Sequence, residues 1–525
     1  MNSPYAQKPW LAQYEIAPQL AQPRHSVLDA LEEHARTNPN LPAIRYFDET
    51  ISFGQLNHWS ECFASLLDKW RIKKGDRVAL SLQNNPQFAV AQYAAWKRGA
   101  IVVPLNPMFR EKELRYHLQD SGALAWVALT SSDNDESRAA VKESAVDHVV
   151  FTSESNFDEM LTESPNLSGR TAIADRDIAY LVYTSGTTGP AKGAMLTHGG
   201  VAFNAEVFRT WMQVGPADSI LGLAPLFHVT GLVAHLALSA WAAVPLILFH
   251  RFDAEQVFRL CRKWNATLSV AAITAYIALM NHSKDEGGQF LEKGYTGGAP
   301  VAPSVTEQFE ARFSTYIHNC YGLTESTSPS HATPLGARAP VDAASGALSI
   351  GVPVPNCDAK IVSLEDPDLE VPPGEAGELL LRGPMIFPGY WNKPEETANA
   401  FHNGYFRTGD VAIMDASGWF YLVDRKKDMI VASGFKVWPR EVEDTLYQHP
   451  AVRETAVIGV PDPYRGETVK AFVALKHGFE QDAASMIQFC RDRISAYKCP
   501  REIVFVPEIP KTATGKFLRR SLRER

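Results

Sequence analysis

The sequence lacks the features that mark several large classes of protein. Its six cysteines are scattered through 525 residues without a C-x-x-C spacing, so a zinc ribbon or a dithiol redox site is not expected. Its formal charge of −8 gives no electrostatic reason to expect nucleic acid as a partner. The opening residues, MNSPYAQKPW, contain no basic stretch followed by an apolar core, so no secretory signal is predicted. Scattered thiols without such a signal indicate a reducing compartment, and we expect a cytoplasmic location.

Long apolar runs are also scarce. Residues 232–249 form an 18-residue run without Asp, Glu, Lys or Arg, which is a marginal length for a membrane span. Pro245 interrupts the run, and its last residues are typical of a buried strand. We therefore predict a buried helix from about Gly231 to Ala243, followed by a short strand. Peripheral contact with a membrane stays open as an alternative.

The chain is too long for one hydrophobic core, so two to four structural units are expected. Strand-like runs such as 78–82 and 101–104 alternate with helix-length segments, which predicts parallel α/β layers. Residues 345–423 are rich in proline and glycine with short apolar runs, which predicts a small antiparallel β-barrel or sheet. No repeat of fixed period is present.

A charge cluster, DRKKD at 424–428, separates this part from the rest of the chain. The cluster suits a solvated turn or, alternatively, a hinge between domains. The residues after it are numerous enough for a small α+β domain. We predict a large N-terminal domain at 1–423, a hinge at 424–428 and a smaller, mobile α+β C-terminal domain at 429–525.

One polar loop, YTSGTTGPAKG at 183–193, follows the apolar run 179–182. Its glycines let backbone N–H groups approach an anion, and its hydroxyl groups add donors. Lys192 adds a positive charge, worth roughly 4 kcal/mol per negative charge at about 4 Å and an effective dielectric near 20. The Walker pattern fails because Ala191 precedes Lys192 and Gly193 follows it, and the pattern G-x-G-x-x-G is absent from the chain. The loop therefore predicts a phosphate cradle of another kind.

This loop resembles the signature loop of the adenylate-forming superfamily, which includes acyl-CoA synthetases, luciferases and the adenylation domains of peptide synthetases. SFGQLN near residue 52 is similar to the superfamily's early segment. Six further segments resemble superfamily motifs in the same order: PLFHVTG (225–231), GGAP (297–300), NCYGLTES (319–326), GYFRTGD (404–410), VDRKKDMIVASGFKVWPREVE (423–443) and PKTATGK (510–516).

The resemblance implies an enzyme, an AMP-forming acid–thiol ligase that uses ATP, Mg²⁺ and CoA. ATP would convert a carboxylate into an acyl-adenylate and release pyrophosphate, after which the thiol of CoA would displace AMP. Negative charge spreads over the phosphates in such a reaction, so preorganised cations and N–H donors should supply most of the catalysis.

The resemblance also assigns residues to the nucleotide. Glu325 would hold Mg²⁺, with Thr184 as a second metal contact, and Thr324 would contact the α-phosphate. Asp410 would accept hydrogen bonds from both ribose hydroxyls, and Arg425 would add a ribose contact. The loop that would hold the β- and γ-phosphates comprises Thr184, Ser185, Gly186, Thr187, Thr188, Gly189 and Lys192. Adenine would be bound by Gly298, Ala299, Pro300, Asn319, Tyr321 and Gly322.

The C-terminal motifs imply a moving domain. Lys516 would bridge the substrate carboxylate and the α-phosphate while the adenylate forms. The small domain would then rotate about Lys427, which would withdraw Lys516 and bring the turn at Gly434 to the site, where it would line a pantetheine tunnel.

The acyl pocket implied by the resemblance has His228 as a gate or wall residue. Thr230, Gly297, Gly298 and Gly322 would complete it, and the glycines would leave room for a long or bulky acyl group. Cys320 lies beside the adenine contact and is expected to pack there, because the mechanism needs no enzyme thiol.

We interpret the chain as a fatty acyl-CoA synthetase for a medium- or long-chain acid. Alternatives are an aryl-acid CoA ligase of the coumarate or benzoate type, an acyl-AMP ligase that serves a separate carrier protein, a luciferase, and a non-enzymatic scaffold. The expected partners are a small carboxylic acid, ATP and CoA, without nucleic acid. The oligomeric state stays open, with a homodimer as one option.

Overall fold

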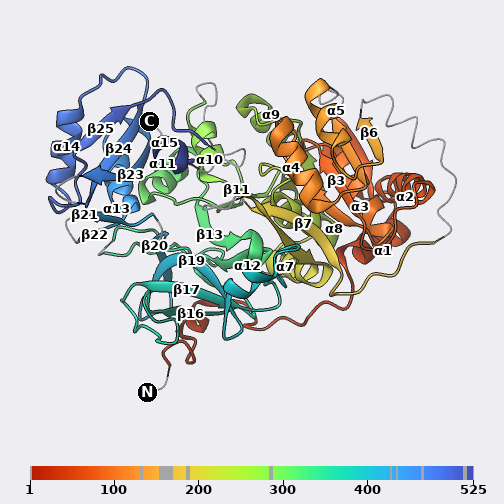
Figure 1. Ribbon diagram of the computed structural model, residues 1–525, viewed down its shortest axis with the longest axis horizontal. Coiled ribbons are helices and arrows are strands. Elements are labelled where there is room, and N and C mark those ends of the chain that lie inside the picture. The colour runs from red at the N-terminus through yellow and green to blue at the C-terminus, as the bar shows by residue number, and fades with distance from the viewer. Residues whose placement is uncertain are drawn as a thin grey trace.

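The computed structural model describes residues 3–129, 134–152, 169–184, 190–282, 288–343, 345–425, 428–432, 435–462, 466–511 and 517–523. Two sheets with parallel strands, a third, antiparallel sheet and a smaller C-terminal unit make up the structure (Figure 1). The predicted mixed α/β fold with layered sheets and a smaller C-terminal domain is therefore confirmed.

The first sheet has the strand order β6-β5-β3-β4-β7-β8. Its neighbouring strands are parallel except for β8, which runs antiparallel to β7. The interior strands are buried almost throughout, as expected for a sheet covered on both faces. The strands are β3 (Arg77–Ser81), β4 (Ile101–Pro104), β5 (Ala125–Leu129), β6 (His148–Thr152), β7 (Ile178–Thr184) and β8 (Lys192–Thr197). The helices along this part are α2 (Phe53–Lys69), α3 (Pro86–Lys97), α4 (Glu111–Ser121), α5 (Asp135–Lys142) and α7 (His198–Trp211).

The second sheet joins segments that are far apart in the chain. Its order is β15-β14-β13-β12-β11-β9-β10-β1-β2, so a strand near residue 45 pairs with a strand near residue 247. The strands are β1 (Pro42–Tyr46), β2 (Glu49–Ser52), β9 (Ile220–Leu221), β10 (Leu246–Leu248), β11 (Leu268–Ala271), β12 (Lys293–Thr296), β13 (Ile317–Leu323), β14 (Ser328–Ala332) and β15 (Val352–Pro353). The accompanying helices are α1 (Val27–Thr37), α9 (Ala254–Trp264), α10 (Ile273–Met280) and α11 (Pro303–Phe313), with the short η4 (Thr324–Ser326) after β13.

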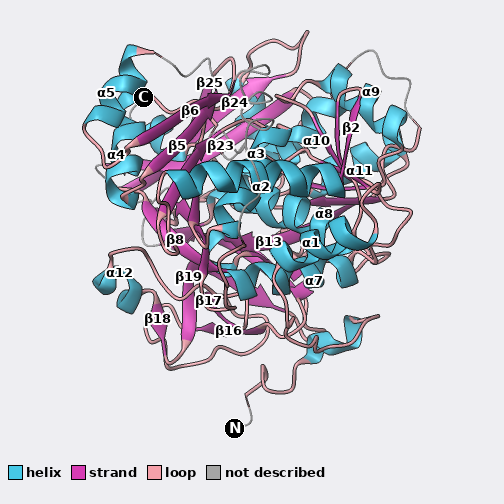
Figure 2. Cartoon of the chain, turned by 90° about the vertical axis from the view of Figure 1, so that its right-hand side faces the viewer, coloured by secondary structure: helices cyan, strands magenta, loops and turns pink. Residues whose placement is uncertain are grey.

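The apolar run at 232–249 folds as predicted. It forms a π-helix, η3 (Gly231–Ala237), then α8 (Leu238–Ala242) and the strand β10, and every residue of η3 is buried. Across the described ranges, we find no helix with both the length and the apolar character needed to cross a membrane. Helices α1, α2, α3 and α8 lie across the middle of the molecule (Figure 2). Every residue of α3 except Gln87 is buried, which fits a helix enclosed within the larger domain.

The third sheet is antiparallel and follows the order β16-β17-β19-β18, with β20 paired to β19. Its strands are β16 (Asp358–Val362), β17 (Gly377–Arg382), β18 (Phe401–His402), β19 (Tyr405–Met414) and β20 (Phe420–Arg425), and α12 (Pro394–Asn399) lies between β17 and β18. The N-terminal segment with η1 (Pro9–Gln13) packs on this sheet, where the rings of Trp10 and Phe420 meet edge to face at 5.9 Å.

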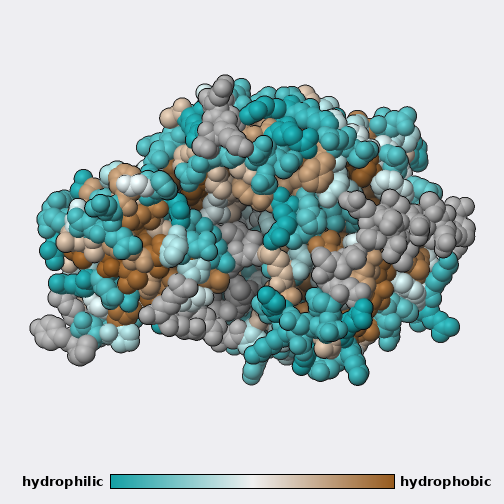
Figure 3. Space-filling view, turned by 90° about the horizontal axis from the view of Figure 1, so that it is seen from above, coloured by the Kyte–Doolittle hydropathy of each residue, from teal (hydrophilic) through white to brown (hydrophobic). Residues whose placement is uncertain are grey.

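The C-terminal unit is an α+β fold with the strand order β22-β21-β24-β23 and with β25 parallel to β24. Seen from above, it lies at one end of the molecule, and a hollow separates much of it from the larger part (Figure 3). Its strands are β21 (Ile430–Ala432), β22 (Phe435–Val437), β23 (Val452–Asp462), β24 (Gly466–Leu475) and β25 (Glu502–Phe505). Its helices are α13 (Pro439–Tyr447), α14 (Ala483–Arg491) and α15 (Arg519–Arg523).

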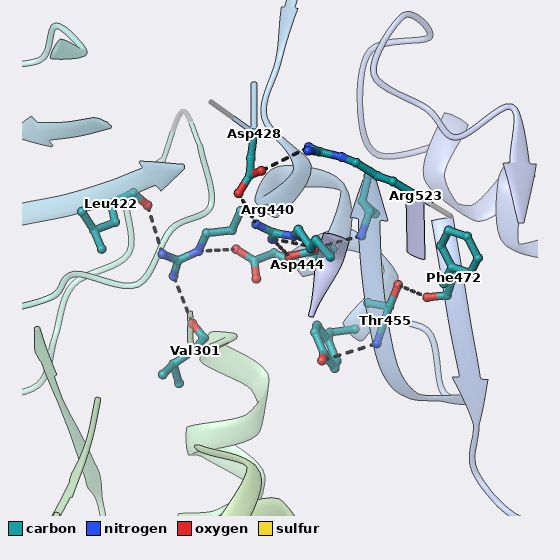
Figure 4. A network of polar contacts seen from close by, with 12 residues as sticks. Val301, Leu422, Asp428, Arg440, Asp444, Thr455, Phe472 and Arg523 are labelled. Atoms are coloured by element: carbon teal, nitrogen blue, oxygen red, sulfur yellow. Dashed lines mark hydrogen bonds and ion pairs between the residues drawn. The ribbon is translucent and has the colours of Figure 1, made fainter. Parts of the chain in front are cut away.

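Arg440 connects this unit to the larger part (Figure 4). The side chain begins in the first turn of α13 and is only 3% exposed. Its guanidinium donates to the carbonyl of Leu422 in β20 at 3.0 Å and to the carbonyl of Val301 at 3.3 Å. It also lies 3.4 Å from the carboxylate of Asp444. A buried, charged donor thus spans the contact between the two parts.

Candidate active site

The candidate residues gather where the parallel strands of the second sheet end. Strands β12 and β13 run in parallel, and Thr296 lies opposite Asn319. The segment 297–300 therefore leaves the carboxyl end of β12 beside Tyr321. Crevices at the carboxyl ends of parallel strands are the usual ligand sites of α/β sheets.

A tyrosine and a carboxylate form a direct hydrogen-bonded pair in this site. The hydroxyl of Tyr321 donates to Oδ2 of Asp410 at 2.7 Å, and both residues are buried. The backbone N–H of Asp410 donates to Oγ1 of Thr408 at 3.1 Å. Asp410 lies opposite Arg425 across strands β19 and β20, although the side chain of Arg425 is outside the described part. The fold thus brings together the predicted adenine and ribose contacts from segments almost 90 residues apart.

The side chain of Asn319 is oriented so that its carboxamide oxygen can accept a hydrogen bond from a ligand. Its side-chain nitrogen donates to the carbonyl of Ser349 at 2.9 Å, which fixes the carboxamide plane. The carboxamide oxygen is then the group that suits an exocyclic amine, the partner predicted for it.

The signature loop closes a β-hairpin. Thr184 ends β7, Lys192 begins β8, and the two residues are paired across the antiparallel ladder. Oγ1 of Thr184 donates to the carbonyl of Lys192 at 3.4 Å. A Walker loop leads from a strand into a helix, so this hairpin explains why the sequence does not fit that pattern.

Lys192 and Glu325 border the same cleft, which has a volume of about 290 Å³. Between them lies Tyr390, whose hydroxyl donates to Oε1 of Glu325 at 2.8 Å. Nζ of Lys192 lies 5.3 Å from the centre of the Tyr390 ring. Burial and then the charge of Glu325 raise the pKa of Tyr390 well above its usual value, so the hydroxyl stays a donor. The cleft is lined by Lys192, Leu323, Glu325, Tyr390, Glu396, Asn399, Ala400, Phe406, Arg407 and Thr408.

The donor set of this cleft fits magnesium bound together with a nucleotide. Within the described ranges, no group of three or more His, Cys, Asp and Glu side chains is arranged to hold a metal ion. Glu325 and Glu396 are the carboxylates among the cleft residues. Magnesium is commonly bound by one or two carboxylates together with the phosphates of a substrate.

Two positions of the predicted acyl pocket are occupied by glycine for a different reason from the one that the sequence suggested. A Cβ on Gly322 would lie 1.7 Å from the carbonyl oxygen of Ser328, and one on Gly297 would lie 2.9 Å from Sγ of Cys320. At both positions the missing side chain makes room for the neighbouring strand rather than for an acyl group. Their backbone can still border a pocket, and that role stays a prediction.

His228 lies in the turn between β9 and η3, where its ring is half-buried. The backbone N–H of Thr230 donates to Nδ1 of this ring at 3.3 Å, so the neutral ring carries its proton on Nε2. Cys320 is buried, and burial raises the pKa of its thiol to about 12. A thiol in that state is not a nucleophile, in agreement with the packing role expected for it.

Several predicted site residues lie outside the described part of the chain. They are Ser185, Gly186, Thr187, Thr188, Gly189, Lys427, Gly434 and Lys516. Sequence reasoning also missed Tyr390 and Arg440. Tyr390 lies outside the motifs quoted above, whereas Arg440 lies within the motif at 423–443, and the hydrogen-bond partners of both come from segments that only the fold brings near.

Two family models match the chain: "AMP-binding enzyme" at residues 31–391 and "AMP-binding enzyme C-terminal domain" at residues 441–516. Since the first alone covers more than half of the sequence, the chain belongs to the AMP-binding enzyme family. The predicted superfamily is confirmed, and with it an AMP-forming acid–CoA ligase that uses ATP, Mg²⁺ and CoA.

Particular relatives resemble nearly the whole chain. A long-chain-fatty-acid–CoA ligase of Bacillus subtilis is 36% identical, over 99% of this chain and 98% of its own length. A feruloyl-CoA synthase of an Amycolatopsis species is 34% identical over 94% and 97%. Among solved structures, ATP-bound MatB from Rhodopseudomonas palustris has a TM-score of 0.87 at 26% identity, covering 95% of this chain and 98% of that one.

Proposed function

We propose that the protein is an ATP-dependent acyl-CoA synthetase that activates a medium- or long-chain fatty acid through an acyl-adenylate and then thioesterifies CoA. The observation that carries the adenylation step is the cleft that Lys192 and Glu325 share. The similarity to long-chain-fatty-acid–CoA ligases along the whole chain supports the class of acid.

We assign the nucleotide contacts as follows. Asp410 and Arg425 hold the ribose, and Tyr321 stacks on adenine while its hydroxyl orients Asp410. The backbone of Gly298, Ala299, Pro300 and Gly322 and the carboxamide of Asn319 complete the adenine site. Residues 184–189 and Lys192 hold the β- and γ-phosphates, and Thr324 contacts the α-phosphate.

Magnesium, when bound, neutralises phosphate charge in the cleft, with Glu325 and Thr184 as the proposed ligands. Lys516 neutralises the charge that develops between the carboxylate and the α-phosphate. His228 and Thr230, with Gly297, Gly298 and Gly322, border the acyl group. We place the domains at 1–423 and 429–525, with a β-rich part at 345–423, a hinge at 424–428 that pivots at Lys427, and Gly434 at the path of CoA.

A panel of acids tests the proposed substrate class. The purified protein receives ATP, Mg²⁺, CoA and one acid at a time, namely octanoate, palmitate, a benzoate or a cinnamate, and AMP release is measured. We expect octanoate or palmitate to have the highest kcat/KM. A preference for the aromatic acids would instead support an aryl-acid CoA ligase, which the similarity to a feruloyl-CoA synthase favours as second candidate.

The acceptor is tested separately from the acid. Pyrophosphate exchange without acylation of free CoA would indicate an acyl-AMP ligase that serves a carrier protein. Binding of ATP without pyrophosphate release for any acid would indicate a scaffold.

The ribose contact leads to a first substitution. Asp410→Asn is expected to raise the KM for ATP about tenfold, because an amide oxygen accepts weaker hydrogen bonds from the ribose hydroxyls than a carboxylate does. The KM is measured by ATP–pyrophosphate exchange. Asp415→Asn is the matched control, since Asp415 also accepts a hydrogen bond from a tyrosine, Tyr421, at 2.8 Å. An unchanged KM for ATP in Asp410→Asn would remove the ribose role.

We also infer a cytoplasmic location, because all six cysteines are buried and unpaired. A homodimer and peripheral membrane contact stay hypotheses. Sedimentation velocity tests the former and flotation with phospholipid vesicles tests the latter.

A further inference from the structure

Tyr390 belongs to the connection between β17 and α12, and its backbone is attached to the strand that carries Lys192. It forms an antiparallel bridge with Ala194. The N–H of Met195 donates to the carbonyl of Gly389 at 3.1 Å, and the N–H of Trp391 donates to the carbonyl of Gly193 at 2.8 Å. The segment 389–391 therefore runs beside β8 immediately after Lys192.

The same connection is attached to Glu325. The hydroxyl of Tyr390 donates to the side chain of Glu325, and the N–H of Phe387 donates to its backbone carbonyl, both at 2.8 Å. The rings of Phe387 and Tyr390 meet edge to face at 4.8 Å, which limits movement of the tyrosine. One short segment thus holds both the carboxylate of Glu325, in η4 just after β13, and the strand of Lys192 in the first sheet.

We propose that Tyr390 is a positioning residue that fixes the carboxylate of Glu325 relative to Lys192 for the magnesium–ATP complex. This inference rests on the proposed function. Magnesium requires near-octahedral geometry, so the orientation of each carboxylate ligand matters. Groups that hydrogen-bond to metal ligands commonly change metal affinity by about 10–100-fold when they are removed. The ring of Tyr390 also offers its face to Lys192, which limits where the ammonium group can go.

The test uses Tyr390→Phe, which keeps the ring and its contacts with Phe387 and Lys192 but removes the hydroxyl. Manganese replaces magnesium, and its binding in the presence of ATP is measured by electron paramagnetic resonance, without any acid. We expect the Kd for Mn²⁺ to rise about tenfold. The KM for the acid should stay near that of the wild type, since the substitution does not reach the acyl pocket.

Two further variants calibrate the measurement. Tyr421→Phe removes a tyrosine hydroxyl that donates to a different carboxylate, that of Asp415, and should leave Mn²⁺ affinity unchanged. Glu325→Gln should weaken Mn²⁺ binding, and adding Tyr390→Phe to it should have little further effect, because the hydroxyl acts through Glu325.

Wild-type Mn²⁺ affinity in Tyr390→Phe, with weakened binding in Glu325→Gln, would overturn the inference, and so would full additivity of the two substitutions. If Tyr390→Phe does not fold, Thr397→Val replaces it, since Oγ1 of Thr397 accepts from the N–H of Tyr390 at 2.9 Å. A smaller rise in Kd is expected there, and no rise would count against the inference. Failure of the wild type to activate any fatty acid would contradict the proposed function and leave this binding test intact.

Discussion

Replacing Lys516 by alanine is expected to lower the rate of acyl-adenylate formation by about 10²–10³-fold, the usual effect of removing a group that stabilises transition-state charge. The reaction of a preformed acyl-adenylate with CoA should change little, because Lys516 would have left the site by then. The first step is measured as acid-dependent ATP–pyrophosphate exchange and the second as acyl-CoA formation from synthetic acyl-adenylate.

The described residues on either side of 512–516 contact the C-terminal unit. Lys511 and Phe517, which flank 512–516, form an isolated bridge with each other. Lys511 also pairs with Glu454, and Arg519 pairs with Glu443 at 2.8 Å. Both flanks are thereby tied to the C-terminal unit, and the split effect of Lys516→Ala depends on a rotation of that unit between the two steps.

The control for this prediction is Lys476→Ala, an exposed lysine of the same unit. It should leave both steps unchanged. An equal loss in both steps for Lys516→Ala would show that Lys516 does not leave the site between them, and the domain rotation would have to be abandoned.

The second large effect is expected from Arg440→Ala. Hydrogen bonds from a charged donor are worth about 1.5–3 kcal/mol each, so losing the two bonds to Leu422 and Val301 should lower the population of the observed domain orientation by about 10²–10⁴-fold relative to others. The two half-reactions should then change in opposite directions, since each would use one orientation.

The orientation itself is measurable by distances between spin labels. Because all six native cysteines are buried, labels can be directed to introduced cysteines at the exposed positions Glu395 and Lys476. We expect a second or broader distance distribution in Arg440→Ala.

Arg440→Lys is the matched control for charge. It keeps a cation beside Asp444 but lacks the planar guanidinium that reaches two carbonyls at once. Its distance distribution and its rates should therefore lie between those of the wild type and Arg440→Ala. If both variants keep the wild-type distance distribution and rates, the contact does not hold the orientation.

Local sequence was sufficient for several parts of this structure. The apolar run at 232–249 forms a buried helical segment and then a strand. The residues that predicted this, Pro245 and the strand-like residues after it, lie within a few positions of one another. The short apolar runs after residue 345 likewise form an antiparallel sheet. The ordered motifs were sufficient for the family, since each motif is contiguous.

Other parts depend on pairing between distant segments. The strand β1 pairs with β10 about two hundred residues later, and no local pattern selects that partner. Gly322 must be a glycine because Ser328 of the next strand occupies the space of a side chain. Sequence alone suggested an open acyl pocket there, since close strand packing and an open pocket both favour glycine.

The sequence by itself determined the family and the fold class, because these depend on short motifs and on local periodicity. Only the tertiary structure decided that Tyr390 joins Glu325 to the strand of Lys192 and that Arg440 joins the two domains. Such contacts arise where separate strands and helices pack, so the geometry of the whole chain selects the partners, and the sequence around either residue does not identify them.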